Sequence, residues 1–561
     1  MKKLGEELAL LSEPPFVSID RMLVKYLEDE WGERNRWVLI AAALCNLAVR
    51  EGHTFLDLGQ VPHLGSTTIR SWPAIDEWKH MLGGCTAVRE EGTENCTPLV
   101  LVNKTKLYLD KYYQYESRLA DRIKSLCSEP DLTEGDVVER AVANRFFVIT
   151  GGPGTGKTTI ALRYLDRLLD RWTEKRPPRF AAVAPTGKAA ARLAESMSSG
   201  VRRLSFDSER EKALLSIPNL TIHRLLGALP NRSTFRHHKG GPIRYDALVV
   251  DESSMIDLPL MSKLLDALPT SCRLLFLGDK DQLTSVDVGS VLGDILAASL
   301  QPDSPLSPLV ERLQKTYRFS EDSGIYAACQ AARVGDVGTF QNILEKGLDD
   351  FSFIETPIES SKIPTEALRL GYGQWESLYQ CSTVDDALAK LNRFVTLIAT
   401  RKGPEGSEAF NRKLASHIRE RLKMDPMGTD PVSASPIIVL ENDYELELYN
   451  GDLGLVWQAD DGSLAAYFVA ANGATRRFRL SEMPSFEPAH ALTIHKSQGS
   501  EFDEISCIFP GKSNRQITRE LVYTAFSRAK KRVTVFSSTK TLTDAVANQA
   551  ARATRLAVLL A

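Results

Sequence analysis

Short apolar segments recur along the middle of the chain, and glycines or acidic residues follow each of them closely. Residues 148–150 lead directly into the glycine-rich stretch 151–159, and a helix-forming segment, 160–169, comes next. Residues 248–250 and 273–277 are two further apolar segments of strand length. Apolar runs of this kind are typical of strands that are buried on both faces of a parallel sheet. We therefore predict an α/β fold with polar loops at the carboxyl ends of its strands.

Two other regions have different patterns. Residues 37–47 predict an apolar-rich helix within an N-terminal domain, residues 1–112, that we expect to be mostly helical. An aromatic-rich segment, 107–115, then leads into a charged connector. Between 403 and 488, turns rich in Gly, Asp and Asn separate short alternating segments, which are residues 436–440, 452–458, 464–470 and 475–480. Such segments predict the strands of a small β-barrel.

The glycine-rich stretch has the sequence of a phosphate-binding P-loop, G-x-x-x-x-G-K-T. Its glycines let successive N–H groups point at one anion, and the following helix adds the partial positive charge of its N-terminus. Lys157 is expected to reach the β- and γ-phosphates, and the Thr158 hydroxyl to ligate Mg²⁺. A glycine-rich turn before an ordinary helix is the alternative, but strand, full motif and helix occur together here. The residues expected to bind ATP are Gly151, Gly152, Pro153, Gly154, Thr155, Gly156, Lys157, Thr158 and Thr159.

The next two apolar segments add groups that suit hydrolysis. Asp251 and Glu252 follow residues 248–250, and we expect Asp251 to hold Mg²⁺ and Glu252 to act as the general base for the attacking water. A solvated strand end is the alternative for this pair, and its spacing from the P-loop favours the functional interpretation. Gln282 follows the third segment, and its amide can both donate and accept hydrogen bonds at the γ-phosphate.

Length and composition limit the number of domains and the kinds of partner that we expect. A chain of 561 residues is too long for one hydrophobic core, and we expect about three or four domains. The formal net charge of −3 neither favours nor excludes nucleic acid as a partner, because a motor can gather its basic groups in one groove.

Eight widely separated cysteines favour buried thiols over a disulfide framework or a metal cluster. Without a membrane-length apolar run or a signal peptide, the chain is predicted to be cytoplasmic and to make no membrane contact.

Longer motifs then occur in a fixed order, and together with the P-loop they resemble the RecD family of superfamily 1 helicases, the alpha subunits of exodeoxyribonuclease V. The resemblance spans roughly residues 145–540, and residues 1–110 resemble the family's N-terminal region more weakly. The motifs are residues 184–193 (APTGKAAARL), 221–227 (TIHRLLG), 314–319 (QKTYRF), 491–503 (ALTIHKSQGSEFD) and 520–529 (ELVYTAFSRA).

This resemblance implies two RecA-like P-loop motor domains. The first would cover residues 113–308 and the second residues 309–402 and 489–561, with an SH3-like barrel, 403–488, inserted in the second. Within the first, the basic excursion 230–242 would be a small pin that meets DNA at the strand junction, and an ordinary surface loop is the alternative. Residues 1–112 would be a docking domain for a partner subunit.

The resemblance also implies roles for single residues. Arg318 and Arg528 would be arginine fingers that reach the γ-phosphate from the second motor domain, joining Lys157, Glu252 and Gln282 as catalytic groups. Tyr317, Gly499 and Glu501 would complete the ATP site. Each candidate contact to single-stranded DNA has a turn former or helix cap as its alternative, and these candidates are Thr186, Gly187, Lys188, Thr221, His223, Thr493, His495 and Ser497.

One position departs from the family pattern. Many relatives carry a glutamine upstream of the P-loop that reads adenine, whereas this chain has none between Ser128 and Phe147, and only Glu134 lies near the expected place. Use of a nucleoside triphosphate is therefore better supported than strict use of ATP.

The implied activity is that of an ATP-dependent helicase moving 5′ to 3′ on DNA. It would be one subunit of a helicase–nuclease that processes double-strand ends in recombinational repair, with RecB-like and RecC-like partner subunits, and the nuclease would lie in a partner. Its DNA partners would be single strands and end-bearing duplexes. Two alternatives stay open: a stand-alone helicase of the same branch, for which we find no helix-hairpin-helix signals in the first 110 residues, and a regulatory subunit that binds ATP without translocating.

Overall fold

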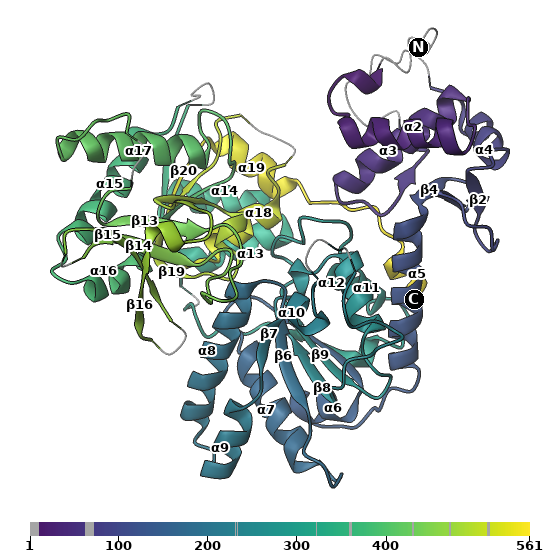
Figure 1. The fold of residues 1–561 in the computed structure, drawn as a ribbon, viewed down its shortest axis with the longest axis horizontal. Coiled ribbons are helices and arrows are strands. Elements are labelled where there is room, and N and C mark those ends of the chain that lie inside the picture. Colours follow the sequence, from purple (N-terminus) through teal and green to yellow (C-terminus); the bar gives the residue numbers. More distant parts are fainter. Residues whose placement is uncertain are drawn as a thin grey trace.

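The computed structural model describes residues 10–61, 72–229, 232, 234–320, 322–357, 362–428, 431–459, 461–470, 473–512 and 516–561. Within these residues the chain forms two parallel sheets, a five-stranded antiparallel sheet and a small four-stranded sheet near the N-terminus. Figure 1 shows the N-terminal part at the upper right, joined to the rest through the long helix α5 (Asp110–Cys127). The two parallel sheets confirm the predicted α/β class.

The first parallel sheet carries the P-loop. Its order is β10-β5-β9-β8-β6-β7, and its strands are β5 (Phe146–Gly151), β6 (Phe180–Ala184), β7 (Asn219–Thr221), β8 (Ala247–Val250), β9 (Arg273–Gly278) and β10 (Val310–Leu313). Its helices are α6 (Val137–Ala143), α7 (Lys157–Asp170), α8 (Gly187–Leu204), α9 (Ser208–Leu215), α10 (Ile222–Leu226), α11 (Leu258–Asp266) and α12 (Val291–Ala298). Because β10 pairs with β5, this domain extends to Leu313, beyond the predicted boundary at 308.

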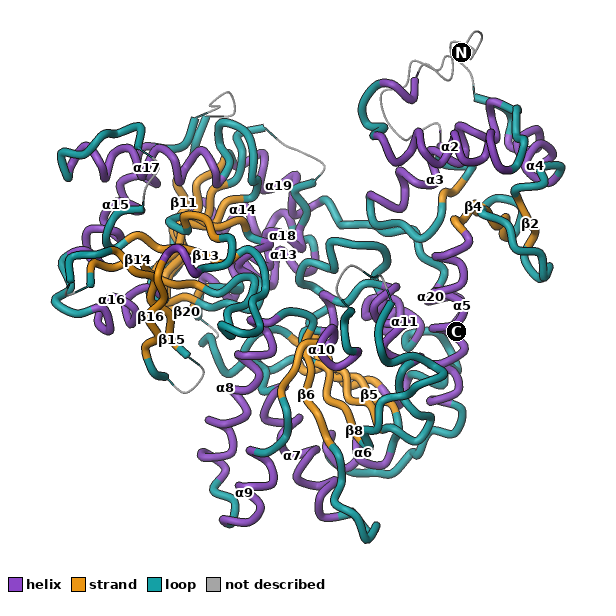
Figure 2. Tube along the Cα trace, viewed as in Figure 1, coloured by secondary structure: helices purple, strands orange, loops and turns teal. Residues whose placement is uncertain are grey.

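The second parallel sheet has the order β11-β20-β19-β12-β18. Its strands are β11 (Phe351–Glu355), β12 (Phe394–Ile398), β18 (Ala491–Thr493), β19 (Phe502–Ile508) and β20 (Ala529–Ser537). Its helices are α13 (Gly324–Val334), α14 (Val337–Lys346), α15 (Thr365–Tyr379), α16 (Val384–Leu391), α17 (Ser407–Arg421), α18 (Arg519–Phe526) and α19 (Thr539–Ala547). In Figure 2 the strands of both sheets lie among helices, and apolar side chains of strands and helices pack together in two buried clusters.

The predicted insertion contains the antiparallel sheet, in the order β16-β15-β14-β13-β17. Its strands are β13 (Ser435–Val439), β14 (Leu453–Gln458), β15 (Leu464–Val469), β16 (Thr475–Arg479) and β17 (Phe486–Pro488), and the first four agree closely with the predicted segments. In this order β16 and β17 are the two edges of the sheet. Helix α17 precedes it and packs against α15 and β18, so the first part of the range 403–488 belongs to the second motor domain.

The N-terminal domain is less helical than predicted. Helices α2 (Ser18–Glu30), α3 (Arg36–Arg50) and α4 (Ile75–Gly83) pack on a sheet of β1 (Leu56–Asp57), β2 (Val88–Glu90), β3 (Leu99–Val102) and β4 (Lys106–Leu109). The expected charged connector is the helix α5, whose buried face includes Leu119 and Ile123. Because α5 packs on α11 of the first motor domain, that domain begins within this helix.

The end of the chain returns to the first motor domain. After α19, residues 548–555 lead to α20 (Leu556–Leu560), which packs on α12 and α5. Figure 1 shows this yellow segment crossing from the second motor domain to α5. We call residues 548–561 the C-terminal strap. It corrects the assignment of the whole range 489–561 to the second motor domain.

Three smaller predictions have mixed outcomes. In the basic excursion, Ala228 pairs with Phe235 and His238 with Gly241, while residues 230, 231 and 233 lie outside the described residues. Six of the eight free cysteines are buried, but Cys96 is exposed and Cys381 is intermediate. None of the helices in the described part of the chain combines the length and apolarity that crossing a bilayer requires.

Candidate active site

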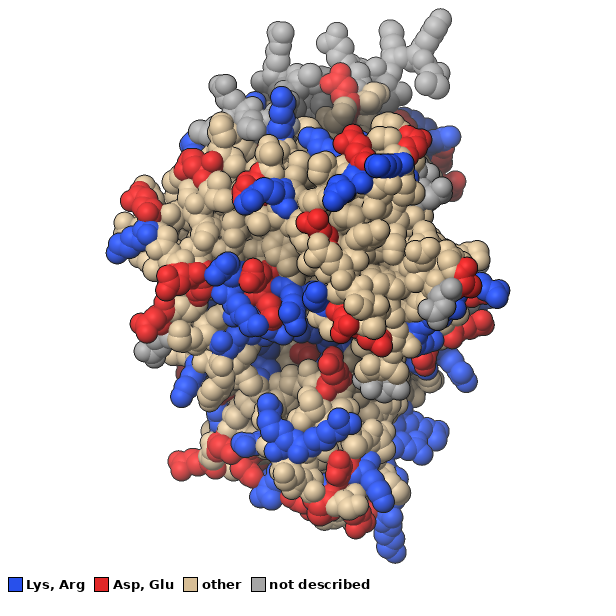
Figure 3. All heavy atoms as spheres, turned by 90° about the vertical axis from the view of Figure 1, so that its left-hand side faces the viewer, with Lys and Arg blue, Asp and Glu red and all other residues tan. Residues whose placement is uncertain are grey.

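A cavity of about 1080 Å³ lies between the two parallel sheets, and segments from both motor domains line it. The first domain supplies the P-loop, α8, the loops after β8 and β9, and the segment after β10. The second supplies Gly499, Glu501 and Arg528. On the face shown in Figure 3, basic side chains lie above and below a hollow between the upper and lower parts of the molecule. The structure therefore brings most of the predicted ATP-site residues together.

The P-loop connects β5 to α7 as the sequence predicts. Gly154 and Gly156 have φ angles of +75° and +87°, in the left-handed region that glycine adopts readily. The Lys157 amine donates hydrogen bonds to the carbonyls of Gly151 and Gly152, at 2.6 and 3.0 Å. Thr158 lines the same cavity. A flexible cation thus stands at the N-terminus of a helix, where an anion is stabilised.

The acidic pair lies directly beyond β8. Glu252 has a φ angle of +48°, rare for a side chain of this size, and its N–H donates to the Asp251 carboxylate at 2.9 Å. Burial and the neighbouring Glu252 raise the pKa of Asp251, while Lys157 opposes this shift. The carboxylates and the Thr158 hydroxyl all line the cavity and are hard oxygen donors, so this set of residues fits Mg²⁺.

The loop after β9 joins the first domain to the second. Gln282 lines the cavity and donates its amide Nε2 to Asp279 Oδ2 at 2.9 Å. The hydroxyl of Tyr523, from α18 of the second domain, donates to the same oxygen at 2.9 Å. The predicted sensor is thus held by a buried carboxylate that both domains contact.

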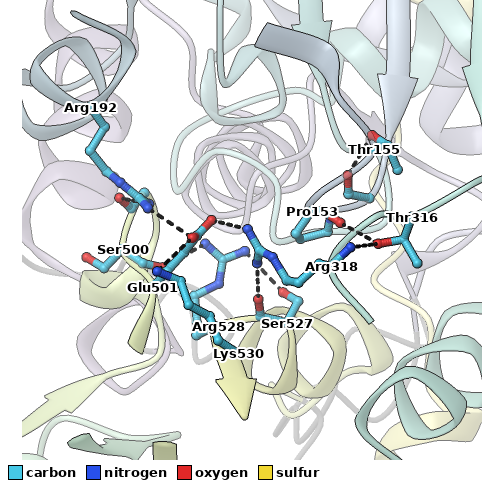
Figure 4. A network of polar contacts seen from close by, with 12 residues as sticks. Pro153, Thr155, Arg192, Thr316, Arg318, Ser500, Glu501, Ser527, Arg528 and Lys530 are labelled. Atoms are coloured by element: carbon cyan, nitrogen blue, oxygen red, sulfur yellow. Dashed lines mark hydrogen bonds and ion pairs between the residues drawn. The ribbon is translucent and has the colours of Figure 1, made fainter. Parts of the chain in front are cut away.

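An arginine cluster surrounds Glu501 on the opposite wall (Figure 4). Its carboxylate pairs with Arg318, with Arg192 at 3.3 Å and with Lys530 at 3.6 Å. Burial opposes ionisation of Glu501, but these cations outweigh it and lower its pKa to about 2. Glu501 therefore remains a carboxylate and orients the guanidinium groups that line the cavity.

The two predicted arginine fingers occupy different places. Arg528 is only 3% exposed and donates to the carbonyls of Thr524 and Ser500, at 3.0 and 3.4 Å. Arg318 follows β10 in the link between the sheets, so its expected place in the second domain is wrong, although it does contact Ser527 there at 3.2 Å. Both side chains line the cavity.

Tyr317 stands at the rim of the cavity with 74% of its surface exposed. Its backbone N–H donates to the Gly154 carbonyl at 2.9 Å, which fixes the segment before Arg318 against the P-loop. The amine of Lys315 lies 5.3 Å from the centre of the Tyr317 ring. The exposed ring is suited to stacking on a flat ligand.

The candidate DNA contacts lie outside this cavity, and several act as caps. The hydroxyls of Thr186 and Thr221 accept N–H groups in the first turns of α8 and α10. Thr493 accepts the N–H of Lys496 at 3.3 Å, and the Ser497 hydroxyl is buried and donates to the Ile494 carbonyl. These four contacts are those of the turn or cap alternative, and the Ser497 side chain is buried.

The other candidates are placed differently. His223 and His495 are exposed. Lys188 donates to the Gly451 carbonyl at 2.9 Å, across to the loop before β14, and burial lowers its pKa to about 8. Gly187 lies against Tyr449 so closely that a Cβ would be 2.4 Å from the Tyr449 Cβ. This motif therefore contacts the loop between β13 and β14.

Arg192 and Tyr523 are residues of the site that sequence reasoning missed. Arg192 is four residues after Lys188 on α8, and residues at that spacing share one helix face. That spacing is a usable signal for Arg192. The role of Tyr523 depends on the packing of α18 against a strand loop about 240 positions earlier, which no local pattern predicts.

Family models match three parts of the chain. The AAA domain matches residues 134–288, the UvrD-like helicase C-terminal domain matches 488–536, and the N-terminal domain of RecBCD enzyme subunit RecD matches 15–108. The RecBCD enzyme subunit RecD of Mycolicibacterium smegmatis is 35% identical over 98% of this chain and 98% of its own length. The chain belongs to the RecD family. The RecD subunit of Mycobacterium tuberculosis is 34% identical over 94% of this chain and 92% of its own.

A more distant relative is the ATP-dependent RecD2 DNA helicase of Deinococcus radiodurans, 28% identical over 76% of this chain and 54% of its own length. Membership of the RecD family makes the chain an ATP-dependent superfamily 1 DNA helicase. The cavity between its parallel sheets is the place where the P-loop, the acidic pair and the arginine cluster meet.

Proposed function

We propose that this RecD-family helicase moves 5′ to 3′ on single-stranded DNA as one subunit of a RecBCD-type helicase–nuclease that processes double-strand ends. The observation that carries the ATP-driven part is the single cavity shared by Lys157, Glu252 and Arg528, which come from both motor domains. Hydrolysis at such a boundary changes the contacts between domains, and that change is what a translocating motor needs.

The residues divide the chemistry among them. Lys157 and the P-loop N–H groups hold the phosphates, and Glu252 accepts the proton of the attacking water. Thr158 and Asp251 would hold Mg²⁺, which when bound neutralises charge on the phosphate oxygens. Arg318 and Arg528 stabilise the charge that develops in the transition state. Tyr317 stacks on the base, in place of a glutamine that reads adenine.

The remaining domains serve DNA and partners. Residues 1–109 dock RecB-like and RecC-like subunits, which supply the nuclease, and the match of residues 15–108 to the RecD N-terminal domain supports this role. The antiparallel sheet after α17 is an SH3-like insertion, and the basic excursion 230–242 is a pin. Single-stranded DNA follows α8 and the exposed histidines His223 and His495.

A stand-alone helicase is the second candidate, and the Deinococcus relative, which is named as a DNA helicase and not as a RecBCD subunit, is the weaker match. Identity is lower there, and the alignment covers 76% of this chain against 98% for the Mycolicibacterium subunit. A regulatory subunit without turnover is disfavoured because the P-loop lysine, both acidic residues and both arginines line one cavity.

The test is substitution of Lys157 by alanine in the purified chain and in its complex with co-purified partners. We expect loss of DNA-stimulated ATP hydrolysis and of 5′–3′ unwinding by this subunit, with an unchanged circular dichroism spectrum. Lys175→Ala, at an exposed lysine of the same domain, is the matched control. Hydrolysis at the wild-type rate by Lys157→Ala would contradict the assignment of this cavity as the site of ATP hydrolysis.

A further inference from the structure

Tyr523 connects the second motor domain to the nucleotide cavity of the first. Its side chain is 4% exposed, and its hydroxyl donates to Asp279 Oδ2 at 2.9 Å. Gln282 donates to the same oxygen at 2.9 Å. Burial and the nearby Asp279 carboxylate raise the pKa of Tyr523 far above its ordinary value, so the hydroxyl remains a donor. One carboxylate oxygen thus receives a hydrogen bond from each motor domain.

The same hydroxyl also faces the P-loop. A Cβ built on Gly152 would lie 2.9 Å from the Tyr523 oxygen, so this glycine leaves the room that the tyrosine occupies. Tyr523 is therefore a side chain of the second domain that contacts both the P-loop and the Asp279 carboxylate, which holds Gln282.

Neighbouring contacts fix the rest of this loop to the second domain. The Leu283 N–H donates to the Thr524 hydroxyl at 2.9 Å, and the Gln498 amide donates to the Leu283 carbonyl at 3.1 Å. Because Leu283 follows Gln282 directly, movement of the second domain alters both the backbone and the side-chain support of Gln282. Thr524 and Gln498 hold the backbone, and Tyr523 acts on the side chain.

The planar geometry of a primary amide explains how Asp279 can orient Gln282. The amide of Gln282 is planar, so a hydrogen bond from Nε2 to Asp279 also fixes the direction of the second N–H and of Oε1. Those are the atoms that would meet the γ-phosphate or the attacking water. Without the Tyr523 hydroxyl, Asp279 Oδ2 would keep only the Gln282 donor, and the carboxylate would be held less firmly by that bond and by the Asp281 N–H on Oδ1 at 3.2 Å.

We propose that Tyr523 is a positioning residue that orients Gln282 through Asp279 when the two motor domains are together. This inference rests on the proposed use of the cavity for ATP hydrolysis. It makes the γ-phosphate sensor of the first domain dependent on the second, so hydrolysis is fast only when the cleft is closed.

The test is Tyr523→Phe, which removes the hydroxyl and keeps the ring. We expect kcat for DNA-stimulated ATP hydrolysis to fall about five- to tenfold, the effect of losing roughly one hydrogen bond, with the KM for ATP unchanged within about twofold. Tyr164→Phe is the matched control, because the Tyr164 hydroxyl is buried in α7 and has no hydrogen-bond partner among the described residues. Its kcat should equal that of the wild type.

A double-mutant cycle separates positioning from general loosening. In a Gln282→Ala background, Tyr523→Phe should lower kcat no further, because the group that it orients is gone. An additive loss, an equal loss in Tyr164→Phe, or a rise in KM without a fall in kcat would overturn the role of Tyr523. An active wild type with an unaffected Tyr523→Phe would overturn this role alone. An inactive wild type would overturn the ATPase assignment and this role together.

Discussion

The guanidinium of Arg318 is paired with the carboxylate of Glu501, and this ion pair joins the link between the motor domains to the second parallel sheet. Arg192 of the first domain and Lys530 of the second lie on the other oxygen of the same carboxylate. Glu501 is therefore held among three cations from different segments. The Arg318 guanidinium donates from one nitrogen to this carboxylate and from another to the Ser527 carbonyl, so Glu501 helps to set the resting position of the arginine.

The first prediction concerns this cluster. Glu501→Gln leaves Arg192, Arg318 and Lys530 without their shared counter-charge, and we expect a loss of about 2–3 kcal/mol in the free energy of unfolding. Because the folded pKa of Glu501 is lowered to about 2, its stabilisation is complete above the unfolded value near 4.5 and declines as the pH falls toward 2. The difference in Tm from wild type should stay constant between pH 8 and 6 and narrow below pH 5. Glu504→Gln, at an exposed carboxylate of β19 just after Glu501, should have no such effect.

The second prediction concerns Gly154. An alanine there would have to adopt a φ of +75°, and its Cβ would lie 2.5 Å from the Arg318 Cβ. We expect Gly154→Ala to weaken ATP binding at least about tenfold, since left-handed strain and a backbone shift together exceed about 1.4 kcal/mol. Fluorescent nucleotide titration measures this. Gly373→Ala, in α15 with open space around it, should bind like the wild type. Equal binding by both variants would show that the P-loop tolerates a side chain against Arg318.

The third prediction separates Glu252 from Asp251. Glu252→Gln removes the base and leaves the other carboxylate in place, so kcat should fall by ~10²–10⁴ while nucleotide and Mg²⁺ affinity are kept. Steady-state hydrolysis and equilibrium binding are measured on the same preparation. If affinity fell as steeply as kcat, Glu252 would be a metal ligand and the division of roles would be wrong.

A feature could be predicted from the sequence when the residues that form it lie close together in the chain. The P-loop, the acidic pair and the strands β13 to β16 could be predicted because turn chemistry and periodicity are encoded within a few residues. The N-terminal sheet could not, because strands as short as β1 carry no measurable alternation. The pairing of β10 with β5 was also missed, since a strand about 160 positions away completes the sheet.

The same limit applies to the site. Arg318 was predicted as a member of a motif, but its pairing with Glu501 depends on how the two domains meet. Thr186 and Thr221 are caps in the structure, and their proposed contacts to DNA stay a prediction, because a cap residue at the start of a helix also stands where phosphates bind. Only the fold reveals that Tyr523 contacts Asp279, which lines the cavity.

The fourth prediction concerns Lys188. Its amine has three donors, of which the Gly451 carbonyl uses one, so it can also contact a phosphate. Because its pKa is lowered to about 8, the cation is lost as the pH rises through 8, and affinity for single-stranded DNA should fall between pH 7 and 9. Lys188→Arg should remove this pH dependence. Lys188→Ala should weaken binding about equally for all sequences and reduce the salt slope by ~0.7. A strong sequence preference at constant salt would contradict phosphate contacts.

The C-terminal strap bears on how the N-terminal domain can be tested. The Thr54 N–H donates to the Ala553 carbonyl at 2.8 Å, and Tyr108 donates to the buried Glu116 of α5 at 2.9 Å. Arg552 of the strap contacts the carbonyls of Gly289 and Asp287 in the first motor domain. Removal of the N-terminal domain would therefore also take away contacts of the strap, so a loss of partner binding has to be separated from a loss of stability.

The last prediction uses two variants to separate these effects. Deleting residues 1–109 removes the whole N-terminal sheet, and we expect the shortened chain to hydrolyse ATP on single-stranded DNA but to recover no large partner subunits in a pull-down from native extract. Arg552→Ala keeps the domain and loosens the strap. We expect it to lower the free energy of unfolding by about 2 kcal/mol, because a network of hydrogen bonds to a charged group is lost. It should melt earlier and still recover the partners, whereas Arg532→Ala, at an exposed arginine of β20, should melt like the wild type. Recovery of the same partners by the shortened chain would contradict a docking role for residues 1–109. Failure of Arg552→Ala to recover them would mean that partner binding needs the strap as well as the domain.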